Sequence, residues 1–156
     1  MRAQKSTLRG DAELKEKWYI MDAEGQVVGR FASRVAKLVR GKMQPDYAPH
    51  QDPKIHVIVT NAEKIVFTAD KMKTKQYIHH SGWRTGIKTT TPEKLISDDK
   101  PERILEKAIH GMLPKGALGR QLNRHVRIFK SGEYTGQHDA QQPEKLDVPT
   151  RKAKDN

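Results

Sequence analysis

The segment Ile55-His56-Val57-Ile58-Val59-Thr60 decides the fold class of this chain. Its residues are mainly β-branched and almost continuously apolar, whereas a strand with one solvated face alternates apolar and polar residues. A short run of this kind is typical of a central strand that is covered on both faces. Such strands occur mostly in parallel sheets, because the helices that connect parallel strands cover the faces of the sheet.

The segments around this strand alternate between strand and helix patterns. Residues 18–21 are aromatic and aliphatic and predict a buried strand that ends at Asp22. From residue 29 to residue 40 the apolar period is helical, and Gly41 is suited to end that helix. Residues 65–67 predict another short strand. This alternation predicts an α/β domain with a mostly parallel sheet and helices over both of its faces.

The middle of the chain carries weaker signals. Residues 71–79 predict a short helix followed by an extended segment. Thr90 and Glu93 have the spacing of a capping box, and Pro92 suits the first turn of a helix. We therefore predict a short helix through residue 96.

Two further helices and a closing strand are predicted downstream. The first helix begins near Asp99 and ends at Pro114, and residues 117–124 predict the second. Residues 126–129 predict the strand. The apolar face expected for the first helix consists of Ile104, Leu105, Ala108, Ile109 and Met112.

The excess positive charge of the chain lies in two windows that contain no acidic residue, residues 71–92 and 107–132. Together the windows hold 11 of the 30 Lys and Arg residues, and the other 19 are balanced by the 19 Asp and Glu residues. The net charge of +11 therefore belongs to the two windows. Long acid-free runs of this kind indicate a surface that binds a polyanion.

The first window combines its cations with flat side chains. Such side chains stack on unpaired bases, while lysine and arginine neutralise the nucleic-acid backbone. Trp83 lies near two glycines and has two interpretations: a stacking side chain on an exposed loop, or a cap that folds back on the core. The RNA-binding residues predicted in this window are Lys71, Lys73, Lys75, His79, His80, Trp83, Arg84 and Lys88.

The second window places arginines at helical spacing. Guanidinium groups suit bidentate phosphate recognition and also stack on bases. The RNA-binding residues predicted here are Lys115, Arg120, Arg124, Arg127 and Lys130. A basic stripe on the upstream helix is either a solvated face or an additional phosphate contact, and it consists of Arg30, Arg34 and Lys37.

Several motif fragments fall short of a catalytic or ligand site. Residues 111–116 have the glycine spacing of a P-loop, but Ala117 and Leu118 stand where that motif needs Lys and Ser or Thr. Residues 116–119 match the GxxG clamp of KH domains, although a turn followed by the start of a helix is the better interpretation. In either case, glycines at these positions would allow a phosphate to approach the protein backbone closely. His79 and His80 lack metal-ligand partners and are interpreted as hydrogen-bond donors to phosphate groups. We expect no catalytic residue, metal site, cofactor or small-molecule substrate.

Composition narrows the class of protein further. The absence of cysteine removes disulfides, thiolate catalysis and Cys-based zinc sites. No apolar run approaches the roughly 20 residues of a membrane span, so we expect no membrane partner. We predict a flexible N-terminal extension over residues 1–16, one α/β RNA-binding domain over residues 17–136, and an extended polar arm over residues 137–156.

Five spaced motifs occur in order along the chain: Val59-Thr-Asn-Ala-Glu-Lys-Ile-Val66; Tyr77 with His80-Ser-Gly82; Gly111-Met-Leu-Pro-Lys115 with Leu118-Gly-Arg120; Val126-Arg-Ile-Phe-Lys-Ser-Gly132; and Gln141-Gln-Pro143. Together they resemble the family of large-subunit ribosomal protein thirteen, and the resemblance spans roughly residues 17–147. One departure is the stretch 133–138, where the resemblance implies a tighter His-Pro-His-like segment.

The resemblance implies a three-layer α/β/α domain with a four-stranded sheet. It also implies a non-enzymatic protein that binds large-subunit rRNA and neighbouring ribosomal proteins and acts early in subunit assembly. The implied location is the large ribosomal subunit in the cytoplasm, or in an organelle. Judged by charge pattern alone, a free-standing RNA- or DNA-binding regulator is an equally good alternative.

Overall fold

A computed structural model describes residues 14–45, 47–134 and 143–146. Its main sheet has the strand order β5-β2-β1-β6, and every neighbouring pair is parallel. The strands are β1 (Lys17–Asp22), β2 (Ile55–Thr60), β5 (Val126–Ile128) and β6 (Glu144–Lys145). The mixed α/β class and the parallel four-stranded sheet are confirmed, and the arrangement is consistent with the three-layer fold.

Strand β2 is buried on both faces, as its apolar run predicted. Ile55, Val57 and Val59 are fully buried and join the main core. Because side chains alternate along a strand, Ile58 and Thr60 lie on the opposite face. They are also buried, with 0% and 6% of their surface exposed. Burying an aliphatic side chain of this size contributes roughly 1.5–3 kcal/mol, so β2 is a main source of stability.

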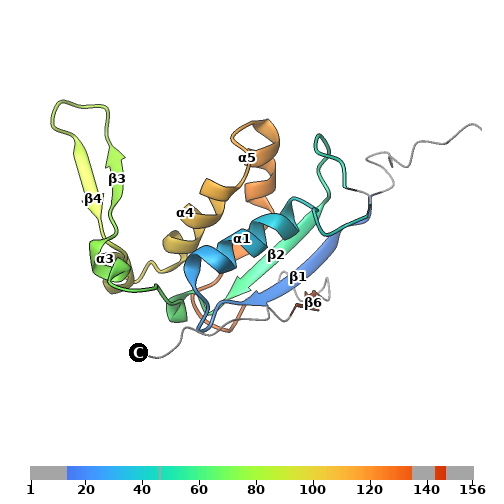
Figure 1. Cartoon of the computed structure of the whole chain (residues 1–156), viewed down its shortest axis with the longest axis horizontal. Helices are drawn as coiled ribbons and strands as arrows, with labels where there is room; N and C mark the ends of the chain where they lie inside the picture. Colours follow the sequence, from blue (N-terminus) through green and yellow to red (C-terminus); the bar gives the residue numbers. More distant parts are fainter. Residues whose placement is uncertain (1–13, 46, 135–142, 147–156) are drawn as a thin grey trace, which may run out of the picture.

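Helix α1 (Val28–Val39) lies along β2 in Figure 1. Helix α4 (Glu102–Met112) packs against α1 and adds Ile104, Leu105 and Ile109 to the core. Gly41 follows the cap residue of α1 with a φ of +77°, a left-handed conformation that ends the helix. The larger apolar residues that give residues 29–40 their helical period are all buried: Phe31, Val35, Leu38 and Val39.

The remaining elements of the described residues are a two-stranded hairpin and four short helices. Strands β3 (Tyr77–His80) and β4 (Ile87–Thr90) form a separate antiparallel hairpin, which projects away from the rest of the molecule in Figure 1. The short helices are η2 (Ala62–Lys64), α2 (Lys71–Thr74), α3 (Pro92–Ser97) and α5 (Ala117–Arg124).

The predicted strand over residues 65–67 was wrong. Val66 makes only an isolated bridge with Val27, which closes the turn between β1 and α1. The fourth strand of the sheet is instead β6, where Glu144 and Lys145 pair with Tyr19 and Ile20. Residues 143 and 146, which flank β6, are also described, whereas the other residues of the predicted arm and residues 1–13 of the predicted extension lie outside the described residues.

Two details of the helices also differed from prediction. The helix cap is Thr91 rather than Thr90, because Thr90 is still paired in β4 and the Thr91 hydroxyl accepts a bond from the Lys94 amide at 3.4 Å. Met112 was expected in the core but is 46% exposed, because α4 ends there and its last turn extends beyond the buried stripe.

A pair of histidine rings lies on the second face of the sheet. His56 stacks on Trp18 with 4.2 Å between ring centroids and 9° between planes, and the His125 ring lies 4.4 Å from His56. Burial is the main cause that lowers the pKa of His56, and the neighbouring His125 lowers it further. Arg127 acts in the same direction, whereas Glu16 and Asp52 oppose it.

This lowered pKa predicts a loss of stability in mild acid. The unfolded chain takes up the proton near the usual histidine pKa of about 6.5, whereas folded His56 resists it. Stability is therefore complete above that pH and falls as the pH drops below it. The free energy of unfolding, measured with urea at about pH 8 and about pH 5, should fall less towards the lower pH in His56→Gln than in the wild type. The exposed His79→Gln should behave as the wild type, and an unchanged loss in His56→Gln would contradict the assignment.

Candidate nucleic-acid interface

The first acid-free window forms α2 and the projecting hairpin. Lys71, Lys73 and Lys75 are exposed on and just after α2, and Arg84 is exposed in the hairpin turn. Trp83 lies at the tip with 78% of its surface exposed, where the Gly86 amide donates to its carbonyl oxygen at 2.9 Å. The interpretation of Trp83 as a core cap was therefore wrong, and the side chain is free to stack on a ligand.

The register of the hairpin places different side chains on its two faces. Residues paired across an antiparallel ladder lie on the same face. His79 pairs with Lys88, so one face carries cationic and polar side chains. His80 pairs with Ile87 on the other face, which also holds Ile78. Ile78 and Ile87 are 68% and 63% exposed, so this face presents two isoleucines to solvent beside His80 and Thr89.

The two windows meet at the foot of the hairpin, around Tyr77. The ammonium groups of Lys75 and Lys107 lie 5.3 Å and 4.6 Å from the centroid of its ring. Burial raises the pKa of Tyr77, and its buried hydroxyl has no hydrogen-bond partner in the described part of the chain. The ring thus holds a lysine from each window close to the same surface.

Helix α5 presents two of the predicted arginines. Arg120 and Arg124 are exposed, while Leu122 on the opposite side is fully buried. Arg127 keeps the helical spacing of these two arginines in the sequence, but it lies on β5, within the strand predicted over residues 126–129, and it is exposed there. Lys115 is exposed in the turn that precedes α5.

Lys130 is less available than the other predicted residues. Its ammonium group forms an ion pair with Asp99, and the hydrogen bond to that carboxylate is the main cause that raises the lysine pKa. Its charge is thus already paired in the free protein. By contrast, the stripe of Arg30, Arg34 and Lys37 on α1 is exposed.

Gly119 does not offer its backbone to a ligand, contrary to the expectation from the GxxG match. It is buried, and the carbonyl group of Pro114 occupies the space beside its Cα. The close approach that this glycine permits is therefore made by the protein itself, at the junction of α4 and α5.

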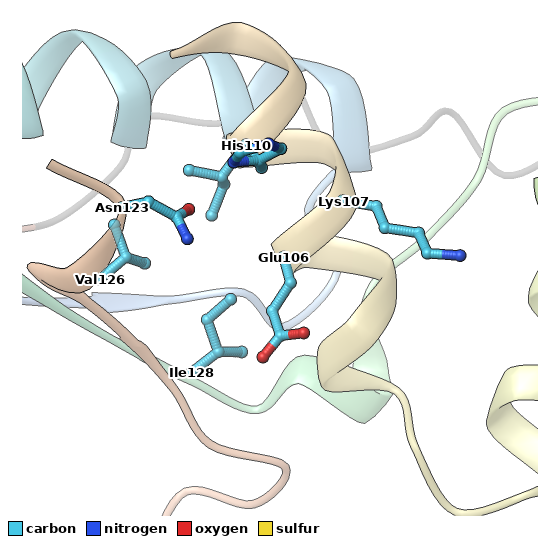
Figure 2. Close-up of a pocket in the computed structure, with 7 residues that line it drawn as sticks. Glu106, Lys107, His110, Asn123, Val126 and Ile128 are labelled. Carbon is cyan, nitrogen blue, oxygen red and sulfur yellow. The ribbon is translucent and has the colours of Figure 1, made fainter. Parts of the chain in front are cut away.

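One cleft of about 360 Å³ lies between α4, α5 and β5 (Figure 2). Glu106, His110 and Asn123 line it together with apolar residues, while Lys107 is directed away from Asn123 and Val126 in Figure 2. Among the described residues, no group of three or more His, Cys, Asp or Glu is close enough to hold a metal ion.

A second cleft, which we call the α1–α4 cleft, has a volume of about 570 Å³ and lies between the start of α1, the end of α4 and α2. It brings together predicted residues from separate parts of the chain, since Arg30, Lys71 and Lys75 all line it. Sequence reasoning missed its apolar walls, which include Phe67 and Met112. It also missed Lys107 and the exposed isoleucines of the hairpin, because the common face of Ile78 and Ile87 follows only from the pairing of β3 with β4.

None of the helices in the described ranges is long and apolar enough to cross a bilayer. The site instead consists of exposed cations, histidines and one tryptophan on acid-free segments. An α/β core with such a surface defines a polyanion-binding protein of the kind that contacts nucleic acid.

Comparison with known proteins gives the family. A family model described as Ribosomal protein L13 matches residues 16–135, and the chain belongs to this family. It is 47% identical over 142 residues to the large ribosomal subunit protein uL13 of Magnetococcus marinus, which covers 91% of this chain and 97% of the relative. The proteins of the same name from Methylorubrum extorquens PA1 and Thermoanaerobacter sp. X514 are 46% and 44% identical over 144 residues, covering 92% of this chain and 93% and 99% of theirs.

Proposed function

We propose that this protein is a structural constituent of the large ribosomal subunit, binds large-subunit rRNA and supports early subunit assembly. The observation that carries the proposal is the surface position of the predicted contacts. Apart from Lys130, every predicted RNA-binding residue of both windows is exposed, and so are the three basic residues of α1. Family membership and the names of the relatives support the ribosome as the place where this surface is used.

The proposed mechanism is electrostatic and shape-based. Exposed lysines and arginines neutralise rRNA phosphates and release counterions, so binding weakens steeply with salt. The projecting hairpin extends this contact away from the core and presents Trp83 for stacking. One protein thereby contacts RNA segments that are separated in space and holds them in a fixed arrangement.

The protein acts without catalysis, cofactor, metal or small-molecule substrate, and its partners are large-subunit rRNA and neighbouring ribosomal proteins. Its place is the large subunit of a cytoplasmic ribosome, with an organellar ribosome as the other setting. The alternative, a free-standing RNA- or DNA-binding regulator, would have the same surface charge.

Sedimentation of a cell lysate separates these two functions. The protein should migrate with large ribosomal subunits and should leave that fraction after RNase treatment. Migration of most of the protein as a free species, or with nucleic acid other than ribosomal particles, would favour the regulator.

Replacing Trp83 with alanine should weaken rRNA binding by about 1–3 kcal/mol, the cost of losing one base-stacking side chain. Because Trp83 is 78% exposed, the melting temperature of the free protein should not change. Filter binding to deproteinised large-subunit rRNA measures the first quantity and calorimetry the second. Met43 is 74% exposed outside both windows, so Met43→Ala is the matched control. Equal affinity of Trp83→Ala and wild type would remove Trp83 from the interface.

A further inference from the structure

We propose that the α1–α4 cleft binds a single unstacked nucleotide of the RNA, with the base against its apolar walls and the phosphate on its cations. This inference rests on the proposed rRNA binding and goes beyond it, because it assigns one site and one kind of RNA element. An extruded nucleotide is a frequent target of RNA-binding proteins, since its base faces and edges are free.

The size and lining of the cleft fit this ligand. Its volume of about 570 Å³ falls in the range of about 300–1,000 Å³ typical of small-ligand pockets. Phe67 and Met112 form apolar parts of the wall, and Phe67 is only partly buried. A planar base can pack against such a wall, as bases do on aromatic side chains elsewhere.

The charge of the cleft selects an anionic ligand. Arg30, Lys71 and Lys75 line it, and none of the described residues that line it is acidic. The Lys75 ammonium lies 6.0 Å from the centroid of the Phe67 ring, so a cation stands beside the aromatic wall. A phosphate and a base on one nucleotide would therefore find their partners within the same cleft.

Two glycines leave room in the cleft. Gly29 and Gly111 both line it, and a Cβ added to either would meet no atom within 4 Å. Both are helical residues without a positive φ, so neither the backbone conformation nor packing requires glycine at these positions. Alanine would be the better helix former. The space that they leave open is space for a ligand.

Polymeric RNA, rather than a free nucleotide, is the source of this ligand. Further cations are exposed on two of the helices that border the cleft, Lys73 on α2 and Arg34 on α1. A mononucleotide would leave these charges without phosphates. Isothermal titration with AMP and with UMP should therefore show no saturable micromolar binding, and such binding would overturn the assignment to RNA.

The main test fills the cleft without changing its charge. Gly111→Leu should lower the affinity for deproteinised large-subunit rRNA by about tenfold or more, the scale of one lost base-stacking contact. His110→Leu is the matched control, because His110 is the adjacent residue on α4 and lines the other cleft. Gly29→Leu fills the α1–α4 cleft from the opposite helix and serves if Gly111→Leu has a lowered melting temperature.

Chemical probing of the rRNA supplies an independent readout. An unpaired nucleotide that the wild type protects should become reactive with Gly111→Leu and stay protected with His110→Leu. If folded Gly111→Leu and Gly29→Leu bind and protect as the wild type does, the cleft proposal is wrong while rRNA binding stands. If the wild type itself fails to bind this rRNA in preference to unrelated RNA, the proposed function fails first.

Discussion

Replacing Gly119 with alanine should destabilise the folded protein by about 3 kcal/mol, at the upper end of the usual cost of overpacking. A Cβ at this position would overlap the carbonyl oxygen of Pro114 and lie 2.6 Å from its carbonyl carbon. Both are backbone atoms, so no side-chain rotation relieves the clash. Helix α5 cannot move away freely either, because its Leu122 is fully buried in the core.

Urea unfolding measures this effect, and Gly116→Ala is its matched control. A Cβ at Gly116 meets nothing within 4 Å, and its φ of −80° suits any residue. Gly116→Ala should therefore unfold with wild-type stability. A Gly119→Ala protein as stable as the wild type would mean that the turn between α4 and α5 yields easily, contrary to the packing described above. Arg120 follows Gly119 directly, so a displaced helix should also weaken RNA binding.

The double replacement of Arg120 and Arg124 by alanine should lower rRNA affinity by at least roughly 100-fold at low salt, because each arginine loses a charge-assisted bond of about 1.5–3 kcal/mol and about 1.4 kcal/mol is a factor of ten. The slope of log affinity against log salt should become shallower by about 1.4–1.8, since each lost phosphate contact removes about 0.7–0.9. Both side chains are exposed, so the free protein should keep its stability.

A second double variant controls for net charge. Lys94 and Arg103 are exposed and lie outside both acid-free windows. Lys94→Ala with Arg103→Ala removes the same two charges and should leave the salt slope nearly unchanged. Equal effects of the two double variants would show that total charge, rather than the surface of α5, governs binding.

Much of the core was predictable because burial leaves a pattern in the chain. The apolar run of β2 indicated a strand covered on both faces, and Ile58 and Thr60 are indeed buried opposite Val57 and Val59. The helical period from residue 29 to residue 40 predicted the buried face of α1. These patterns are local, and the elements that they predict are present in the folded protein.

The errors arose where distant parts of the chain compete for the same place. Residues 65–67 have the composition of a strand, but Val66 pairs outside the main sheet and the edge of β1 is taken by β6. The two residues of β6 are charged and carry no strand pattern of their own. Their pairing depends on the edge that β1 offers, which sequence reasoning from local patterns cannot see.

In the candidate site, too, the local features were predictable from the sequence, and the features that join distant segments were not. Exposure of the basic residues followed from the acid-free windows, because charges without partners favour solvent. The α1–α4 cleft did not follow, since it joins Arg30, Phe67, Lys71 and Met112 from separate segments. The ion pair of Lys130 with Asp99, which reduces its role, likewise spans 31 residues.

Ultraviolet cross-linking inside purified large ribosomal subunits tests the central claim, that the two acid-free windows form the RNA-binding surface. Peptides that carry RNA adducts are identified by mass spectrometry. The adducts should concentrate in residues 71–90, including Trp83 at the hairpin tip, and in residues 115–127. Adducts confined to peptides outside the two windows, such as residues 93–106, would contradict the account.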